Sequence, residues 1–306
     1  MQKIEKSILY VIVIALLLLM VSCDFTDNPS ALVGHWLREG GVRAENKPKK
    51  SIELFKDGTG VCDGNRISWK VENERLILLS SLRKIISNYK VSNIELILTY
   101  DDGKSAIFVK KGYAEIAKEA RIAAFKAKSK KGSFTDDRDS KAYKTLRLNK
   151  QIWMAENLNY NANGSKCYDN SESNCQKYGR LYDWLTAIES CPVGWHLPSN
   201  AEWQVLVDFA GDDEYAGDIL KASSGWNDYN GKSGNGVDAV GFSALPGGSG
   251  NSDGHFFNIG EGNSWWSATQ HDSTEAYIRI IGYNSTNVNR YNSDKSNFSS
   301  VRCIRN

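Results

Sequence analysis

Apolar and polar positions alternate with a period of two along residues 31–111. The alternation is clearest in IELFKDGTGV, NRISWKVENERLILL and YKVSNIELILTYDDGKSAIFVKK. Because successive side chains of a strand point to opposite faces, these segments predict antiparallel strands with one face in water. Turn-forming pairs separate them at Asp57-Gly58, Glu72-Asn73 and Asp102-Gly103. We expect five or six strands, which form a small barrel or sandwich.

The same segment carries LVGHW, FKDGTG and ISWKV, which resemble motifs of the lipocalin-like domains common in bacterial lipoproteins. The resemblance implies a β domain over residues 31–111. A ligand cavity of the lipocalin type needs about eight strands, which is more than this pattern predicts. A spacer barrel without a ligand is therefore the favoured interpretation of this domain.

The pattern changes at residues 112–139. The stretch YAEIAKEARIAAFKAKSKK is rich in Ala and Lys and contains neither Pro nor Gly, which predicts a short helix or a charged linker. The overlapping stretch KSKKGSFTDDRDSK predicts an exposed connector. We expect a helical, charged linker with a solvated basic face, and contact of that face with anionic lipid is the alternative.

Residues 140–306 begin with a hairpin and continue with helices. YKTLRLNKQIWM alternates on both sides of a turn at Asn149-Lys150, which predicts the hairpin. YGRLYDWLTAIES has apolar residues at helical spacing from Leu181 to Ile188, and Cys191-Pro192 ends this predicted helix. The strands that follow are short and separated by loops rich in Gly and Asn.

A second helix is predicted after Ser199. Ser199 and Glu202 have the spacing of a capping box, and Gly211 is a stop signal. The apolar stripe between them consists of Trp203, Leu206, Val207 and Ala210. The expected fold class is α+β: a small antiparallel β-barrel or sandwich, a helical linker, and a domain with two helices and a loop-rich sheet.

Residues 1–22 have the composition of an export signal. Basic residues precede an apolar run from Ile8 to Leu19, which is shorter than the roughly 20 residues of a transmembrane helix. Met20-Val21-Ser22-Cys23 resembles a bacterial lipobox, and the resemblance implies attachment of lipid to Cys23. We expect a cell-envelope protein anchored to the outer membrane, periplasmic or surface-exposed; an ordinary signal peptide or an uncleaved anchor is the alternative.

Charge and cysteine content narrow the partners and the compartment. A formal net charge of +2 argues against a nucleic-acid partner, which usually meets a concentrated basic face. With Cys23 assigned to lipid, Cys62 is expected to be a small buried hydrophobe. Four cysteines towards the C-terminus predict two disulfides in an exported protein: Cys167, Cys175, Cys191 and Cys303.

Six motifs along residues 140–306 occur together: WMAENLNYN, CYDN…NCQKYGRLYDW, CPVGWHLPSNAEW, GFSALPGG, WWSAT and SVRCIRN. They resemble the Fibrobacter succinogenes major paralogous domain family, whose members are mostly secreted or lipoprotein domains without an established activity. GWHLPSNAEW and VRCIR are also similar to segments of formylglycine-generating enzymes, which implies a C-type-lectin-like fold. That fold implies the bridge Cys191–Cys303, and Cys167 with Cys175 would form the second bridge.

An enzyme and a binding module are the two function classes that remain. An enzyme would need Cys191 as a thiolate near His196, and the implied disulfide removes that thiolate. Formylglycine-generating enzymes bind copper through two cysteines near the C-terminus, where this chain has only Cys303. No two of the four histidines have the spacing of a zinc site on a helix. We expect no cofactor and no metal; a secreted hydrolase or oxidase is the alternative.

Aromatic residues concentrate between positions 226 and 297 among Asn, Ser and Gly, a mixture that suits recognition surfaces. The predicted binding surface consists of Trp226, Tyr229, Trp265, Trp266, Tyr277, Tyr283 and Tyr291. One ring of the Trp265-Trp266 pair is expected in the core, because neighbours in a strand face opposite ways. The expected function is binding or adhesion at the cell envelope, with polysaccharide or protein as the ligand.

Overall fold

The computed structural model describes residues 29–32, 34–38, 51–62, 65–80, 84–91, 95–99, 101, 105–110, 112, 114–211 and 215–305. The predicted signal peptide, the lipidation residue Cys23 and the turn Asp102-Gly103 lie outside the described residues. The chain divides into two compact units within helix α2 (Ala114–Lys128), between Arg121 and Ile122. Among the residues described, no helix is both long and apolar enough to cross a membrane.

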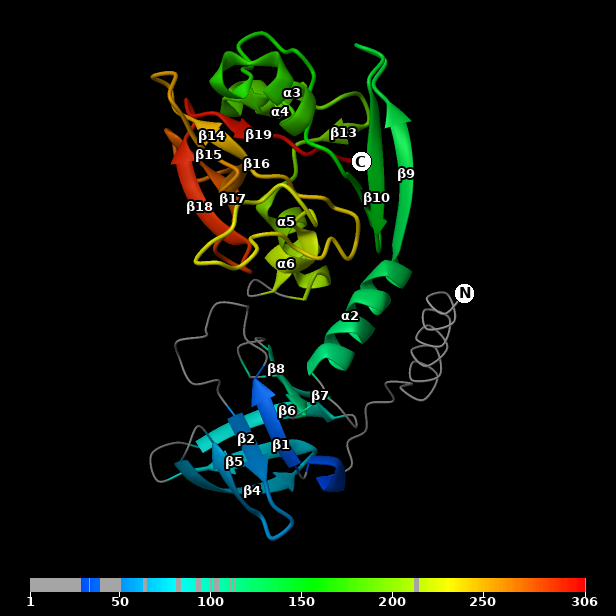
Figure 1. The fold of residues 1–306 in the computed structure, drawn as a ribbon, viewed down its shortest axis with the longest axis vertical. Helices are drawn as coiled ribbons and strands as arrows, with labels where there is room; N and C mark the ends of the chain where they lie inside the picture. Colours follow the sequence, from blue (N-terminus) through cyan, green and yellow to red (C-terminus); the bar gives the residue numbers. More distant parts are fainter. Residues whose placement is uncertain are drawn as a thin grey trace. The chain divides into compact units, whose positions relative to one another are not determined.

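The first unit is a closed antiparallel barrel in which each strand pairs with the next along the chain and β1 pairs with β8 (Figure 1). Its strands are β1 (Gly34–Arg38), β2 (Ser51–Leu54), β3 (Thr59–Cys62), β4 (Asn65–Glu72), β5 (Arg75–Leu79), β6 (Lys84–Val91), β7 (Glu95–Thr99) and β8 (Ser105–Lys110). The prediction of five or six strands was wrong. Each long alternating run contains two or three short strands, and the alternation continues across the turns between them.

The barrel interior is apolar. Trp36 belongs to the buried cluster of the interior and has no exposed surface, and its indole N–H donates to the carbonyl of Leu32 at 2.8 Å. The turn between β4 and β5 is Asn73-Glu74, one residue later than predicted, and both residues have positive φ. Cys62 is half-buried and packs against the same interior. Inward residues include Ile52, Leu54, Leu76, Leu78, Tyr89, Val91, Leu96, Leu98 and Phe108.

The second unit contains two sheets, with strand order β13-β20-β11-β10-β9 in the first. Its strands are β9 (Ser129–Thr135), β10 (Ala142–Leu148), β11 (Gln151–Met154), β13 (Trp195–His196) and β20 (Ile304–Arg305). The predicted hairpin is β10–β11, with Leu148 opposite Gln151. The segment predicted as an exposed connector after the linker helix is mostly exposed, but at β9 it is a strand that pairs with β10 over its whole length.

The other sheet is mixed, and half of its strand pairs join strands that are not consecutive in the chain. Its order is β12-β19-β16-β14-β15, with β17 and β18 added beside β16. Its strands are β12 (Leu181–Tyr182), β14 (Gly247–Gly250), β15 (Phe256–Ile259), β16 (Gly262–Gln270), β17 (Glu275–Gly282), β18 (Asn289–Asp294) and β19 (Ser299–Ser300). The C-terminal region is therefore α+β, as predicted.

Four α-helices accompany these sheets, two more than predicted: α3 (Glu172–Tyr178), α4 (Trp184–Ser190), α5 (Asn200–Phe209) and α6 (Ala216–Leu220). Of the missed helices, α6 is only five residues long, and α3 is polar except for Cys175 and Tyr178, so neither shows an apolar stripe at helical spacing. Helix α4 begins later than predicted because Asp183 caps it, accepting a hydrogen bond from the Thr186 N–H at 3.0 Å. Leu181 belongs to β12 instead.

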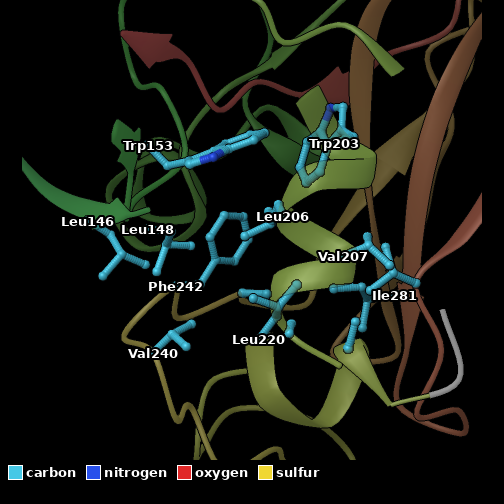
Figure 2. Packing of buried hydrophobic residues seen from close by; sticks show 14 of the residues in the cluster. Leu146, Leu148, Trp153, Trp203, Leu206, Val207, Leu220, Val240, Phe242 and Ile281 are labelled. Carbon is cyan, nitrogen blue, oxygen red and sulfur yellow. The ribbon is translucent and has the colours of Figure 1, made fainter. Parts of the chain in front are cut away.

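The core of the second unit forms where α5 packs against the β10–β11 hairpin. Figure 2 shows Trp153, Trp203 and Phe242 gathered with leucines from β10 and α5. The centroids of the Trp153 and Trp203 rings lie 4.9 Å apart. A second buried cluster includes Trp184, Trp266 and Cys303. Trp265 of β16 belongs to the first cluster and Trp266 to the second, so both faces of β16 are covered.

Candidate functional site

The segment 191–203 brings together Cys191, His196 and Glu202, and all three stabilise the fold: Cys191 forms a disulfide, and His196 and Glu202 are bonded to each other at the start of α5. Cys191 forms a disulfide with Cys303, and Cys167 forms one with Cys175, so both expected bridges are present. Disulfides persist in oxidising compartments, which indicates a protein that folds outside the cytoplasm. A nucleophilic thiolate at Cys191 is excluded while this bridge is intact.

His196 and Glu202 meet at the start of α5. The Nε2 atom of His196 lies 2.8 Å from Glu202 Oε1, while Glu202 Oε2 accepts hydrogen bonds from the Ser199 N–H and hydroxyl. Burial alone would raise the pKa of Glu202, but the hydrogen bonds from Ser199 and His196 together hold it below its ordinary value. The predicted capping box is present, and His196 orients its carboxylate.

The three tryptophans of the predicted binding surface are not on the surface. Trp226, Trp265 and Trp266 are buried, so this part of the prediction was wrong. Each indole N–H donates inside the unit: Trp226 to Ala244 O at 3.0 Å, Trp265 to Asn157 Oδ1 at 2.9 Å, and Trp266 to Tyr182 O at 2.7 Å. Adjacent tryptophans are both buried because core packs on both faces of β16.

The four tyrosines of that prediction do not form one surface. Tyr229 packs edge-to-face on Tyr283, with centroids 5.3 Å apart. Tyr277 lies in β17 opposite Asn292, whereas Tyr291 lies opposite Ile278. Because paired residues of an antiparallel ladder share a face, Tyr277 and Tyr291 point to opposite sides of the sheet. The structure therefore supports a small Tyr229–Tyr283 patch and no continuous aromatic surface.

A groove beside α4, for which the sequence carries no local signal, has a volume of about 600 Å³. Its lining residues are Tyr160, Asn161, Ala162, Asn163, Trp184, Leu185, Thr186, Ile188, Glu189 and Ser190. Leu185 is 68% exposed and Ile188 39% exposed. The helical spacing of these two residues predicted the helix correctly, but it gave no sign that part of its apolar stripe faces solvent.

Neighbouring contacts hold the walls of this groove in place. The Arg138 guanidinium lies 3.8 Å from the centroid of the Tyr160 ring and donates to the carbonyl of Ser190 at 2.9 Å. Arg138 also pairs with the buried carboxylate of Asp136 at 2.7 Å. Burial opposes ionisation of Asp136, yet the hydrogen bonds from Arg138 lower its pKa. The Trp184 indole donates to Ser267 O at 2.9 Å.

Two described clusters have side chains of the kinds that bind metals, but in the first of them Cys167 and Cys175 are joined in a disulfide. The second cluster is His271, Asp272 and Glu275. His271 Nδ1 lies 3.1 Å from Asp272 Oδ2 and 3.6 Å from Glu275 Oε2, and all three residues are at the surface. The other oxygen of Asp272 accepts hydrogen bonds from Thr274 and from the Glu275 N–H, which lower the Asp272 pKa. These hydrogen bonds stabilise the turn between β16 and β17, and this structural role accounts for the cluster without a metal.

Comparison with known proteins identifies the second unit. The family model of the Fibrobacter succinogenes major domain matches residues 146–305, which include both disulfides, the capped helix α5 and the groove beside α4. Neither a curated protein nor a solved structure matches the chain significantly. Since the matched residues make up more than half of the sequence, the chain belongs to the Fibrobacter succinogenes major domain family.

Proposed function

We propose that this protein is a non-catalytic binding protein of the cell envelope and that the groove beside α4 binds a neutral polysaccharide. The observation that carries the proposal is the lining of the groove, which combines aromatic and aliphatic surface with side-chain amides. Tyr160 and Leu185 supply apolar contact, and Asn161 and Asn163 supply hydrogen bonds. Ligand sites commonly combine apolar walls with a few such polar groups.

The charges of the groove favour an uncharged ligand. Glu189 is the one acidic residue among those that line it, and no Lys or Arg belongs to the lining. A protein partner of opposite charge would find no complementary cluster there. Glycoside hydrolysis commonly uses a pair of carboxyl groups, so a single Glu189 supports binding rather than the hydrolase alternative.

The remaining parts of the chain would present this module at the membrane. We infer that Cys23 carries lipid and that the barrel, whose motifs resemble lipocalin-like domains, acts as a spacer. Eight strands reach the number that encloses one small ligand in lipocalins, and the described side chains of the interior, including Trp36, pack in one buried apolar cluster. A C-type-lectin-like fold of the second unit also remains part of this proposal.

The test is binding of the purified full-length protein to a panel of neutral polysaccharides, by affinity electrophoresis and calorimetry. We expect Leu185→Asp and Asn163→Ala each to weaken binding at least tenfold. Val205→Asp, at a similarly exposed aliphatic position on α5 outside the groove, is the matched control and should bind normally. Equal binding by Leu185→Asp, no binding to any member, or release of new reducing ends would overturn the proposal.

A further inference from the structure

A second hollow in the same unit has a volume of about 310 Å³ and shares no lining residue with the groove beside α4. It lies between the start of β10, the chain that follows β11, the end of α3, and residues 243–245. Its inner wall includes Asn157, Asn159 and Arg302. The proposed polysaccharide groove does not account for any of these three side chains.

Arg302 is a buried cation whose hydrogen-bond partners are all neutral. It donates from Nε to Asn157 Oδ1 at 2.9 Å, from Nη1 to the carbonyl of Phe242, and from Nη2 to the carbonyl of Ser243 at 3.0 Å. Its guanidinium lies 4.0 Å from the centroid of the Phe242 ring. A guanidinium has five N–H groups, so three acceptors leave donors available.

No described Asp or Glu forms an ion pair with Arg302. A buried charge without a counter-charge is unfavourable, because its interactions with water are lost and are not replaced in full. Burial lowers the Arg302 pKa to about 9, and the more distant Asp238 and Glu156 oppose that effect. The side chain is therefore still protonated at neutral pH and keeps a positive charge at the wall of the hollow.

The other charges that line the hollow are mostly positive. Lys141, Lys144 and Lys177 accompany Arg302, and Glu156 is the one acidic lining residue. Glu156 is already engaged, because Lys144 Nζ lies 3.3 Å from its Oε1 and the Lys144 N–H donates to its Oε2 at 2.8 Å. Basic groups around a concave site concentrate anions there.

Asn159 adds an unfilled acceptor to this hollow. Its Oδ1 atom is buried and accepts no hydrogen bond. The backbone of Asn159 is fixed on both sides, since its N–H donates to Tyr143 Oη at 3.0 Å and its carbonyl accepts from Lys141 Nζ. Buried polar atoms normally have a partner, and because Asn159 belongs to the lining of the hollow, a hydroxyl of a bound molecule is a candidate partner for Oδ1.

We propose that this hollow binds a small hydroxylated carboxylate, with the carboxylate beside Arg302 and a hydroxyl donating to Asn159 Oδ1. The volume is near the lower end of ligand sites, which begin at about 300 Å³, so one sugar-sized ring fits better than an oligomer. A sugar acid has both required groups. It can arrive as a free acid or as the terminal residue of an acidic polysaccharide.

The test uses the full-length protein and matched probes in titration calorimetry at neutral pH. We expect D-galacturonate to bind at least tenfold more tightly than D-galactose, which lacks the carboxylate, and than acetate, which lacks the hydroxyls. Polygalacturonate distinguishes the sources: tighter binding of the polymer identifies a chain end, and equal or weaker binding identifies the free acid. Equal affinity for galacturonate and acetate would indicate a general counter-ion site and overturn the proposal, as would equal affinity for galactose or no binding.

One variant in the hollow and two controls outside it test the assignment. Asn159→Asp adds a negative charge at the wall while preserving the backbone contacts, and we expect at least a tenfold loss of galacturonate affinity. Lys150→Gln, in the exposed turn between β10 and β11, removes a charge outside the hollow and should bind normally. Leu185→Asp should also bind normally, so failure of the groove proposal is distinguishable from failure here. Unchanged affinity in Asn159→Asp would overturn the assignment.

Discussion

The two units of this chain are stabilised in different ways. In the barrel, every strand pairs with its sequence neighbour, the final closure joins β1 to β8, and the interior is apolar. In the second unit, β20 lies between β13 and β11, and β19 lies between β12 and β16. Contacts of high sequence separation lose more chain entropy when they form. The second unit therefore depends on interactions that the barrel does without.

Those interactions are covalent and polar. Both disulfides of the described residues lie in the second unit, and one joins positions separated by 112 residues. Arg302 and Asn157 are buried there, and Asn157 Oδ1 accepts from both Arg302 and Trp265. A buried network that connects β16, β19 and the C-terminus specifies one arrangement of short strands whose ladders contain few hydrogen bonds.

Removal of the long-range disulfide is expected to cause the largest loss of stability, and only in the second unit. We expect Cys191→Ser with Cys303→Ser to destabilise the second unit by about 4–5 kcal/mol, on the chain-entropy model. The Cys167–Cys175 disulfide closes a much shorter loop, so its removal by Cys167→Ser with Cys175→Ser should cost about 2–3 kcal/mol. Urea unfolding followed by circular dichroism measures both. If the two pairs cost the same, loop length is not the basis of the difference.

Core truncation in each unit tests whether the two fold separately. We expect Trp203→Ala and Trp36→Ala each to cost about 3–5 kcal/mol, since both rings are buried. Each substitution should lower the melting temperature of its own unit and leave the other transition in place, as seen by calorimetry. A single transition that shifts with both substitutions would show that the units unfold together and contradict the distinction.

The smallest expected effect concerns the cap of α5 and its pH dependence. The folded state lowers the pKa of Glu202, so its stabilising contribution is complete above the ordinary carboxyl pKa of about 4.3 and is lost as pH falls further. Glu202→Gln should cost roughly 1 kcal/mol at pH 7 and progressively less as the pH falls through the lowered pKa of the folded state. Glu261→Gln, an exposed carboxyl, is the control. A loss that does not change with pH would assign the effect to packing.

Local signals in the sequence were reliable where one element decides its own structure. Ser199 and Glu202 predicted the start of α5, and alternation around Asn149-Lys150 predicted the β10–β11 hairpin. The cysteine count predicted two bridges, and the family resemblance supplied their pairing. The number of barrel strands was underestimated because the three predicted turns divide the alternating runs into six segments, whereas β1 lies outside those runs and one segment contains parts of both β6 and β7.

The candidate sites were less predictable because they depend on what covers each face. A sequence rich in Trp and Tyr predicted a surface, but Trp226, Trp265 and Trp266 are buried by elements distant along the chain. Leu185 and Ile188 were spaced like core residues and instead border a groove. No local pattern indicates that Asn159 and Arg302 line the same hollow, since they are separated by more than a hundred residues.

By itself, the sequence determined the export signal pattern, the alternating strands, the capped helix and the family motifs, because each depends on residues within a few turns of chain. Only the tertiary structure decided barrel closure, the burial of both faces of β16, and the hollows beside α4 and Arg302. These features depend on burial, and burial is a property of the elements that pack together rather than of any one segment.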